Sequence, residues 1–140
     1  MKPELQLARE TAERMLRGDA ASRRLGITID IPAAGEAVAT MTVTADMHNG
    51  HGVCHGGLLF TFADTAFAFA CNGYGVDTLS SGGHIDFLHP ARAGDVLTAH
   101  ASERHRGRRQ GVYDVTVRNQ EGHDVALFRG QSVALSASSK

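Results

Sequence analysis

One charged residue, Asp64, lies inside an apolar segment that runs from Gly57 to Asn72. Directly upstream is a loop rich in Gly, His and Asn, which extends from His48 to Gly57. An ionised carboxylate is costly to bury unless it is hydrogen-bonded, and the first turn of a helix has free N–H groups that can bind a developing oxyanion. A carboxylate and backbone donors within one loop–helix unit therefore favour chemistry on a carbonyl group.

The spacing between these two groups predicts more than one subunit. An α-helix rises about 1.5 Å per residue, so the eight residues from Gly56 to Asp64 span roughly 12 Å along the axis. Two groups this far apart on one helix cannot both contact the same carbonyl. If both act on one bond, the helix terminus comes from one subunit and the carboxylate from another, which predicts a shared active site.

Asp64 must be ionised if it is to attack a carbonyl carbon or to deprotonate water, whereas an apolar environment raises its pKa. Hydrogen bonds to the carboxylate are therefore needed, and Thr65, Asn49 or an amide of a partner chain could donate them. The residues do not distinguish a covalent anhydride route from direct attack by water. Both routes need one carboxylate that faces one polarised carbonyl.

The elements that position these groups follow from the apolar pattern. Apolar residues at three- and four-residue steps, with Pro3 near the beginning, predict an amphipathic helix over 3–17. The segment 57–72 is apolar on nearly all sides, which predicts a buried helix. Alternating residues predict two antiparallel strands at 27–31 and 37–43 and further strands near 78–88, 95–105, 111–119 and 124–134.

One apolar helix among about six mainly antiparallel strands is most simply covered by a curved sheet that wraps around it. We therefore predict the α+β class with the hotdog arrangement. A Rossmann-like fold would instead need helices between parallel strands. We expect a single domain over 1–140, with an N-terminal helical segment over 1–24 and a loose tail over 135–140.

Composition is that of an ordinary globular protein, with 42% hydrophobic and 21% charged residues in 140. A formal net charge of −1 gives no reason to expect a nucleic acid or an anionic membrane as partner. The longest apolar run is interrupted by Asp64 and the N-terminus carries charges, so we expect no membrane span, no secretory signal and a cytoplasmic location. Two cysteines, Cys54 and Cys71, without C-x-x-C spacing argue against a disulfide scaffold or a zinc ribbon.

Three groups of residues carry a resemblance to a known family. They are Asn49 with His55-Gly56-Gly57 and Asp64-Thr65-Ala66-Phe67-Ala68, then Asp86-Phe87-Leu88-x-Pro90, then Val125-Ala126-Leu127-Phe128-Arg129-Gly130. Over roughly residues 25–134 the chain resembles the acyl-CoA thioesterases of phenylacetic acid degradation. It is similar, more broadly, to the hotdog-fold thioesterases, for which H-G-G with an acidic residue at this spacing is a specific combination.

The resemblance implies hydrolysis of a coenzyme A thioester, with phenylacetyl-CoA or a ring-hydroxylated relative as substrate. It also implies a homodimer with shared active sites, often paired into a homotetramer, and we expect no metal ion and no cofactor. Asp64 would be the nucleophile or general base, and the Gly56 N–H would polarise the thioester carbonyl. Asn49 and His55 would hold the substrate or water.

Further substrate contacts are expected around these residues. Ser80 or Ser81 matches a polar position that orients water in some relatives, and Gly57 and Thr65 lie beside the catalytic groups. A basic cluster is formed by Arg104, Arg106, Arg108 and Arg109 with His105. It could be a solvated hairpin tip, but coenzyme A carries several phosphate charges. We assign Arg108 and Arg109 to its nucleotide end.

Several residues also have simpler interpretations. The residues His48, His51, Cys54 and His55 could be read as metal ligands, although no second cluster would complete the site. Cys54 could be a nucleophile of lowered pKa, yet it has no assigned base. Asn49 could support a tight turn with Gly50, and Asp64 could be a structural carboxylate. The aromatic residues of the apolar segment could line an acyl pocket or belong to the core: Phe60, Phe62, Phe67 and Phe69.

Other functions remain open at this point. The acyl group could be of medium chain length or of another kind. A hydratase or dehydratase on enoyl thioesters would need a His paired with an acidic residue in a motif that this helix lacks. A non-catalytic acyl-CoA-binding protein would use Asp64 for structure alone.

Overall fold

The structure is a computed structural model that describes residues 2–136. Its helices are α1 Pro3–Gly18, α2 Ala20–Arg24, the short 3-10 helix η1 Ala45–Met47 and α3 Gly56–Cys71. Its strands are β1 Thr28–Asp30, β2 Glu36–Thr42, β3 Thr78–Phe87, β4 Val96–Arg106, β5 Gln110–Arg118 and β6 Asp124–Ala134. Both long helices and all six strands were predicted. Most of the predicted loose tail, residues 137–140, lies outside the described residues.

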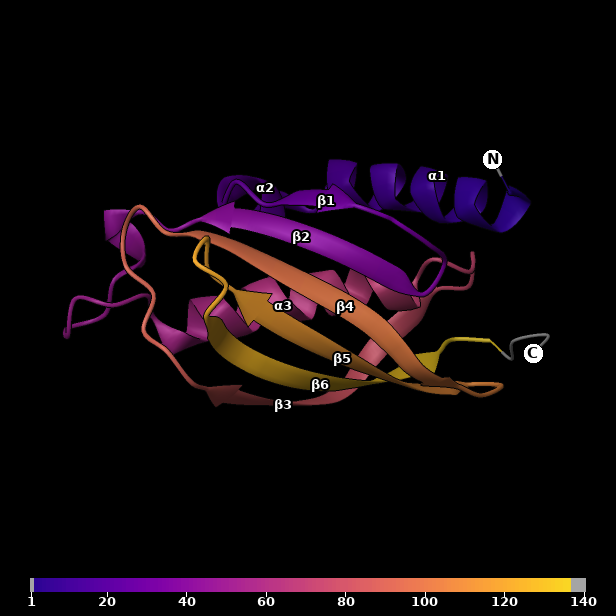
Figure 1. Ribbon diagram of the computed structural model, residues 1–140. Helices are drawn as coiled ribbons and strands as arrows, with labels where there is room; N and C mark the ends of the chain where they lie inside the picture. Colours follow the sequence, from indigo (N-terminus) through magenta and orange to yellow (C-terminus); the bar gives the residue numbers. More distant parts are fainter. Residues whose placement is uncertain (1, 137–140) are drawn as a thin grey trace.

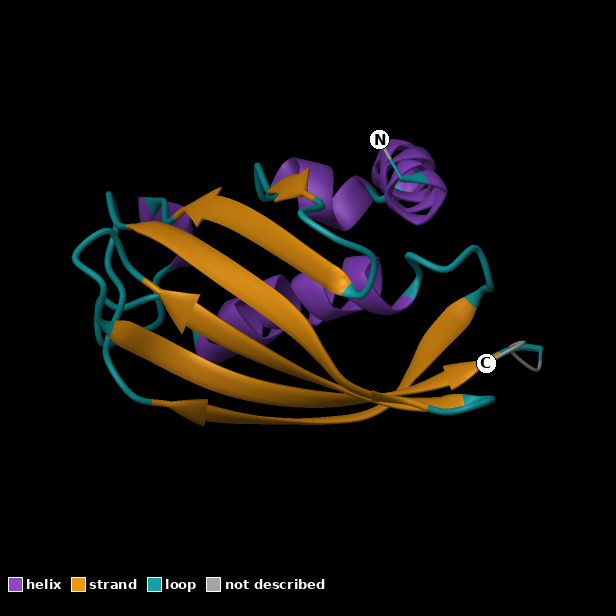
Figure 2. Ribbon diagram, turned by 45° about the vertical axis from the view of Figure 1, so that its right-hand side comes forward, coloured by secondary structure: helices purple, strands orange, loops and turns teal. Residues whose placement is uncertain are grey.

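The six strands form one antiparallel sheet with the order β1-β2-β4-β5-β6-β3. The sheet curves, and α3 lies against its concave face while α1 and α2 lie at the end that carries β1 (Figures 1 and 2). The α+β prediction and the wrapped hotdog arrangement are confirmed. Strand β3 pairs only with β6, so it forms one free edge of the sheet.

Helix α3 is buried, and its buried side chains are mainly phenylalanine and alanine. Phe62, Ala63 and Ala66 are fully buried, and Phe67 is 1% exposed. A Cβ atom added at Gly130 of β6 would lie 2.8 Å from the Phe67 ring, so only glycine permits this close approach. Each buried Phe contributes roughly 1.5–3 kcal/mol through removal of apolar surface from water. This packing fixes the helix rigidly against the sheet.

The short helix α2 lies within the predicted N-terminal helical segment 1–24, but it was not predicted as a separate helix, because five residues are too few to show a helical period. Its N-cap is Asp19, which accepts hydrogen bonds from the Ser22 backbone N–H at 3.0 Å and from the Ser22 hydroxyl at 2.7 Å. Ser22 is 1% exposed, and its Oγ lies 3.4 Å from Oγ1 of Thr65 in α3. The turn of α3 next to Asp64 is thus packed against α2.

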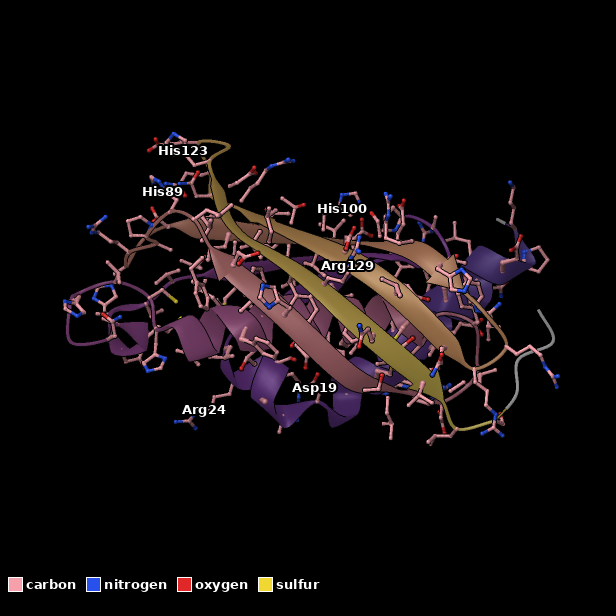
Figure 3. All side chains as sticks on the ribbon, turned by 90° about the horizontal axis from the view of Figure 1, so that it is seen from below. Asp19, Arg24, His89, His100, His123 and Arg129 are labelled. Atoms are coloured by element: carbon pink, nitrogen blue, oxygen red, sulfur yellow. The ribbon has the colours of Figure 1, made fainter. Side chains whose placement is uncertain are left out.

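The outer face of the sheet is polar, and His100 and Arg129 lie on it (Figure 3). Arg129 donates two hydrogen bonds to the Asp114 carboxylate, at 2.6 and 2.9 Å. The Arg129 guanidinium therefore holds the pKa of Asp114 below its usual range. Within residues 2–136, no helix combines the length and the apolar character that crossing a membrane requires.

Candidate active site

The loop before α3 is organised by Asn49. Its side-chain Oδ1 accepts hydrogen bonds from the backbone N–H groups of His51, at 2.9 Å, and Val53, at 3.4 Å. The Asn49 backbone N–H donates to Val53 O at 2.8 Å. The oxygen of Asn49 therefore supports the turn, as one interpretation of the sequence had it. The Nδ2 group forms no hydrogen bond with any residue in the described part of the chain, so its two donors can still reach a ligand.

His55 is the N-cap of α3. Its Nδ1 accepts a hydrogen bond from the Gly57 N–H at 3.0 Å, which requires a ring nitrogen without a proton. His55 O accepts from the N–H groups of Leu58 and Leu59, at 2.9 and 3.2 Å. The cap leaves the Gly56 N–H without an acceptor among residues 2–136. One backbone donor at the positive end of α3 is thus unpaired within the described chain.

Gly57 is placed differently from what its predicted role requires. Its N–H is bonded to His55, and its carbonyl accepts from Thr61 Oγ1 at 3.0 Å. Both of its backbone groups are therefore used within the helix terminus, and substrate binding by Gly57 stays a prediction. His55 likewise contacts the helix terminus, so its first role is to position Gly56.

The Phe87 ring covers Gly56, and sequence reasoning did not place it in the site. A Cβ added at Gly56 would lie 3.0 Å from Cζ of Phe87, a residue that is itself 54% exposed. Phe87 ends β3 on the inner face of the sheet, opposite the buried Ala126. Two features of the sequence could have placed Phe87 in the site: its alternation with Ile85 along the strand, and the Asp86-Phe87-Leu88 motif. The ring forms an apolar wall beside the free Gly56 donor.

Asp64 lies on the half-buried stripe of α3, which it shares with Phe60, Ala68 and Asn72 at four-residue steps. Burial raises the pKa of its carboxyl group. Within residues 2–136 no hydrogen bond or ion pair is formed by the Asp64 side chain. A structural carboxylate would be paired, so this arrangement argues against the structural interpretation of Asp64.

The same stripe faces the inner side of the edge strand β3. Near one end the Phe60 ring lies beside Gly83, where an added Cβ would meet it at 3.3 Å. At the other end Asn72 donates to Thr78 O at 3.0 Å and accepts from Thr78 N at 2.9 Å. Asp64 lies between these two contacts along the helix. The inner side of β3 between Thr78 and Gly83 is therefore the surface next to the carboxylate.

Ser80 belongs to that surface, because it pairs with the buried Ser132 of β6. Ser81 is the extra residue of a β-bulge, and its hydroxyl donates to Gln131 O at 3.1 Å. The Ser80 hydroxyl makes only a long 3.5 Å contact with Gly82 O. The bulge could not be read from the sequence, which left the choice between the two serines open. The geometry favours Ser80.

Thr65 lies on the other side of the helix from this surface. It is 8% exposed, and its hydroxyl donates to Thr61 O at 2.7 Å. Neither Thr65 nor Asn49 of the same chain donates a hydrogen bond to Asp64. Of the three donors considered from the sequence, the amide of a partner chain is left. A contact of Thr65 with substrate stays a prediction.

The phenylalanines of α3 divide between the two roles considered. Phe62, Phe67 and Phe69 are at most 2% exposed and belong to the core. Phe60 is half-buried on the Asp64 stripe, and its ring packs edge-on against Phe128 with centroids 5.3 Å apart. Phe60 is therefore the member of this group that can contact an acyl group.

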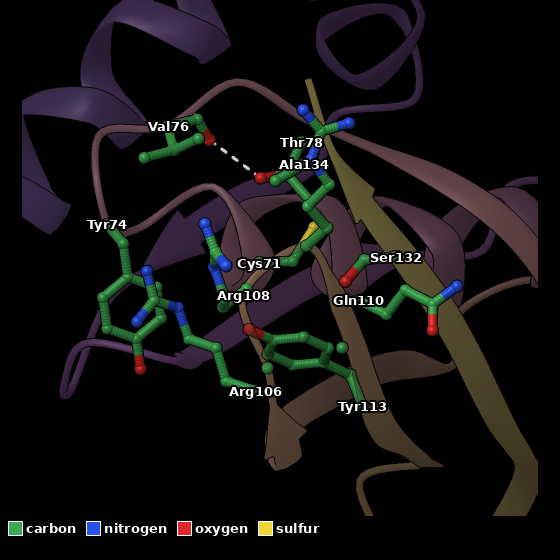
Figure 4. Close-up of a pocket in the computed structure, with 13 residues that line it drawn as sticks. Cys71, Tyr74, Val76, Thr78, Arg106, Arg108, Gln110, Tyr113, Ser132 and Ala134 are labelled. Carbon is green, nitrogen blue, oxygen red and sulfur yellow. Dashed lines mark hydrogen bonds between the residues drawn. The ribbon is translucent and has the colours of Figure 1, made fainter. Parts of the chain in front are cut away.

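The arginine cluster is not next to Gly56. Arg108 and Arg109 lie at the β4–β5 hairpin and line a cavity at the C-terminal end of α3 (Figure 4). Arg104 instead pairs with Asp114 at 3.6 Å. Arg106 lies across the Tyr74 ring, 3.7 Å from its centroid. Arg106, Arg108 and Arg109 thus line one cavity, whereas Arg104 is paired outside it.

The alternative chemistries for the loop find no support. Burial raises the pKa of the Cys54 thiol, which is the opposite of what a thiolate nucleophile needs. His48 Nε2 accepts from Ala93 N at 2.9 Å, and His55 caps α3. In the described range 2–136, no three or more His, Cys, Asp or Glu side chains come together as metal ligands.

Comparison with known proteins decides the family. Residues 51–126 match the sequence profile of the Thioesterase superfamily. The chain belongs to this superfamily. It is similar to the acyl-coenzyme A thioesterase PaaI of Escherichia coli K12, with 54% identity over 123 residues that cover 88% of each protein.

Solved structures agree with this assignment. The structure of E. coli PaaI, from the phenylacetic acid degradation operon, matches with a TM-score of 0.93 and 50% identity, covering 96% of this chain and 97% of that one. A hypothetical thioesterase protein of Streptococcus pneumoniae TIGR4 with coenzyme A matches with a TM-score of 0.75 and 30% identity, covering 81% of this chain and 91% of that one. The resemblance drawn from the sequence motifs is confirmed.

Proposed function

We propose that this thioesterase hydrolyses the thioester of phenylacetyl-CoA or hydroxyphenylacetyl-CoA to the free acid and coenzyme A. The observation that carries the proposal is the Asp64 carboxylate, which is half-buried and unpaired in the described chain, on a helix whose first N–H, that of Gly56, is also unpaired there. The likeness to PaaI, whose name and operon point to acyl-CoA and phenylacetic acid, supports the substrate class. We also propose the cytoplasm as the location.

In this reaction the Gly56 N–H donates to the thioester oxygen and stabilises the negative charge that develops there. Asp64 either attacks the carbonyl carbon, which forms a mixed anhydride that water then hydrolyses to the free acid and Asp64, or takes a proton from water that attacks the carbonyl carbon directly. The C–S bond then breaks, and coenzyme A leaves as a thiolate that needs little acid catalysis. A raised pKa makes Asp64 a stronger base than an ordinary carboxylate, provided that it is ionised at the working pH.

We propose that one active site is formed by two chains, in a homodimer that pairs further into a homotetramer. Gly56 and Asp64 are separated by roughly 12 Å along α3, which is too far for one carbonyl. The free edge of β3 lies next to Asp64 and carries exposed apolar side chains, including Phe87, which covers Gly56. A second chain that pairs along this edge would bring its own helix terminus to Asp64.

We assign the orientation of water to Ser80. The solved S. pneumoniae relatives include an aspartate-to-alanine and a threonine-to-alanine variant, and the two substituted positions are 16 residues apart. Asp64 and Ser80 have the same separation in this chain. Asn49 adds its free Nδ2 donors at the other end of the site. His55 acts by holding the helix terminus.

Release of free thiol from a panel of acyl-CoAs tests the proposal. The panel contains phenylacetyl-CoA, hydroxyphenylacetyl-CoA, acetyl-CoA and octanoyl-CoA, and a chelator is present throughout. We expect the highest kcat/KM for the aromatic thioesters, with hydrolysis by Asp64→Asn reduced at least 1,000-fold, a loss typical of a catalytic residue. Hydrolysis that favours octanoyl-CoA would refute the aromatic assignment. Binding of acyl-CoA without hydrolysis would instead show a binding protein.

A further inference from the structure

The carboxamide of Asn72 joins the end of α3 to the start of β3. Its Nδ2 group donates to Ala68 O at 2.9 Å and to Thr78 O at 3.0 Å, and its Oδ1 accepts from the Thr78 N–H at 2.9 Å. Both hydrogens of the amide and one acceptor position are therefore used. Asn72 is half-buried, and it lies at the end of the α3 stripe that carries Asp64 and Ala68.

Within residues 2–136, this is the only polar link between the two elements, because no other side chain hydrogen-bonds α3 to β3. The connection between them contains two glycines, Gly73 and Gly75, and Gly75 has a φ of 77°. Glycine has the widest conformational freedom, so the connection alone does not fix the position of β3 along α3. At the other end of the helix, the contact of Phe87 with Gly56 is apolar and imposes no bond direction.

The link sets how far along α3 the strand begins. Asp64 precedes Asn72 by eight residues, roughly 12 Å along the helix axis. Ser80 follows Thr78 by two residues, roughly 7 Å along the strand. Since Phe87 at the end of β3 covers the first turn of α3, the strand runs back along the helix from Thr78 toward Asp64. A shift of β3 along α3 would therefore move Ser80 relative to Asp64.

We propose that Asn72 is a positioning residue for the water that takes part in hydrolysis. This inference rests on the proposed function, in which Ser80 orients that water and Asp64 either activates it or forms the anhydride that it hydrolyses. Asn72 acts through Thr78, which keeps Ser80 at a fixed distance from Asp64. Such precision matters, since a misplacement of about 1 Å by a change far from the reacting atoms can cost about 100-fold in rate.

Two substitutions separate this role from the stability of α3. Asn72→Ala removes all three hydrogen bonds of the side chain. Asn72→Ser removes the two bonds to Thr78 but keeps a hydroxyl that can donate to Ala68 O. The hydroxyls of Thr61 and Thr65 donate in this way to the carbonyls four residues earlier in the same helix, at 3.0 and 2.7 Å. We therefore expect Asn72→Ser to fold with a Tm close to that of the wild type.

The matched control is an asparagine of the same kind outside the site. Asn119 Oδ1 accepts hydrogen bonds from the N–H groups of Glu121 and His123, both at 3.0 Å, in the β5–β6 hairpin. Asn119→Ala removes two bonds between an asparagine side chain and the backbone, the same number that Asn72→Ser removes. It should lower Tm without changing kcat for phenylacetyl-CoA.

A double-mutant cycle with Ser80 tests the proposal, with thiol release from phenylacetyl-CoA measured well below the lowest Tm. Asn72→Ala and Asn72→Ser should each lower kcat about tenfold, the cost of one hydrogen bond to the water, with KM unchanged. In the Ser80→Ala background, Asn72→Ser should lower kcat no further, because its effect passes through Ser80. A loss of about 100-fold in the double variant, as expected for independent effects, would overturn the proposal. An unchanged kcat in Asn72→Ser would overturn it as well.

Failure of the proposed function gives a different result. If the wild type hydrolyses no acyl-CoA of the panel, the role in hydrolysis fails with the proposed function, and amide hydrogen exchange decides whether Asn72 fixes β3. Faster exchange at Thr78 and Ser80 in Asn72→Ser, without such a change in Asn119→Ala, would support the positioning of the strand. Exchange at the wild-type rate would refute that as well.

Discussion

The cap that His55 places on α3 should control both stability and catalysis. The helix begins with two glycines, Gly56 and Gly57, which favour helix formation about 1 kcal/mol less than alanine. The 3.0 Å bond from the Gly57 N–H to His55 Nδ1 is therefore important for the first turn. His55→Ala removes this acceptor and leaves the first turn free to fray. The exposed Gly56 N–H then loses its fixed direction.

The magnitude follows from these two effects. Loss of an N-cap side chain costs about 1 kcal/mol, which corresponds to a fall in Tm of about 4 °C for a chain of this size. Loss of one oxyanion donor costs about 100-fold in kcat. We therefore expect His55→Ala to lower Tm slightly and kcat strongly. Thermal unfolding and thiol-release kinetics on the same samples measure both.

His55→Asn is the matched control, because asparagine is among the best N-cap residues and lacks the imidazole. If His55 acts by positioning, this variant recovers most of both Tm and kcat. Recovery of Tm without recovery of kcat would show that the imidazole itself contacts the reacting groups. An unchanged kcat in His55→Ala would refute the reasoning about the Gly56 donor.

Three further predictions concern other parts of the site. Because burial raises the pKa of Asp64, the folded chain binds this proton more tightly than the unfolded chain does. The wild type therefore loses stability as pH rises above the ordinary carboxyl pKa of about 3.9. We expect the Tm of Asp64→Asn to lie above that of the wild type at pH 7 and to match it near pH 3. A Tm difference that does not change with pH would contradict this prediction. Ser80→Ala should lower kcat about tenfold, the cost of one hydrogen bond to the attacking water, whereas Ser81→Ala should not; equal effects in kinetic assays would argue against the assignment. Gly130→Ala should lower the free energy of unfolding by about 1–3 kcal/mol, because the added Cβ would lie 2.8 Å from the Phe67 ring. Chemical denaturation measures this change, and an unchanged free energy of unfolding would show that the sheet can shift.

The sequence predicted those features that depend on periodic burial. Helix α3 and the strands were read from apolar patterns, and both extend within a few residues of the predicted ranges. The Asp64 carboxylate was recognised because a charge within an apolar segment is conspicuous. These features are local, so one sequence suffices to reveal them.

What the sequence did not reveal depends on side-chain hydrogen bonds and on distant packing. Asn49 and His55 were expected to hold substrate or water; the turn that Asn49 supports was one alternative considered from the sequence, whereas the cap that His55 forms on α3 was not predicted. The bulge at Ser81 and the contact of Phe87 with Gly56 join segments that are far apart along the chain. Helix α2 lies within the predicted helical segment 1–24, but its separation from α1 depends on the Asp19 cap, which no period in the sequence indicates. Such features follow from the fold as a whole.

Subunit mixing tests the central claim most directly, which is that one active site takes Asp64 from one chain and the Asn49–Gly56 loop from another. One inactive protein is Asp64→Asn. The other is Asn49→Asp, which keeps the Oδ1 that supports the turn but replaces the free Nδ2 donors. After subunit exchange has been verified with two differently tagged chains, we expect thiol release from phenylacetyl-CoA to recover toward a quarter of the wild-type rate. In a random mixture half of the dimers are mixed, and each mixed dimer contains one intact site of two. No recovery in verified mixed dimers would contradict the account.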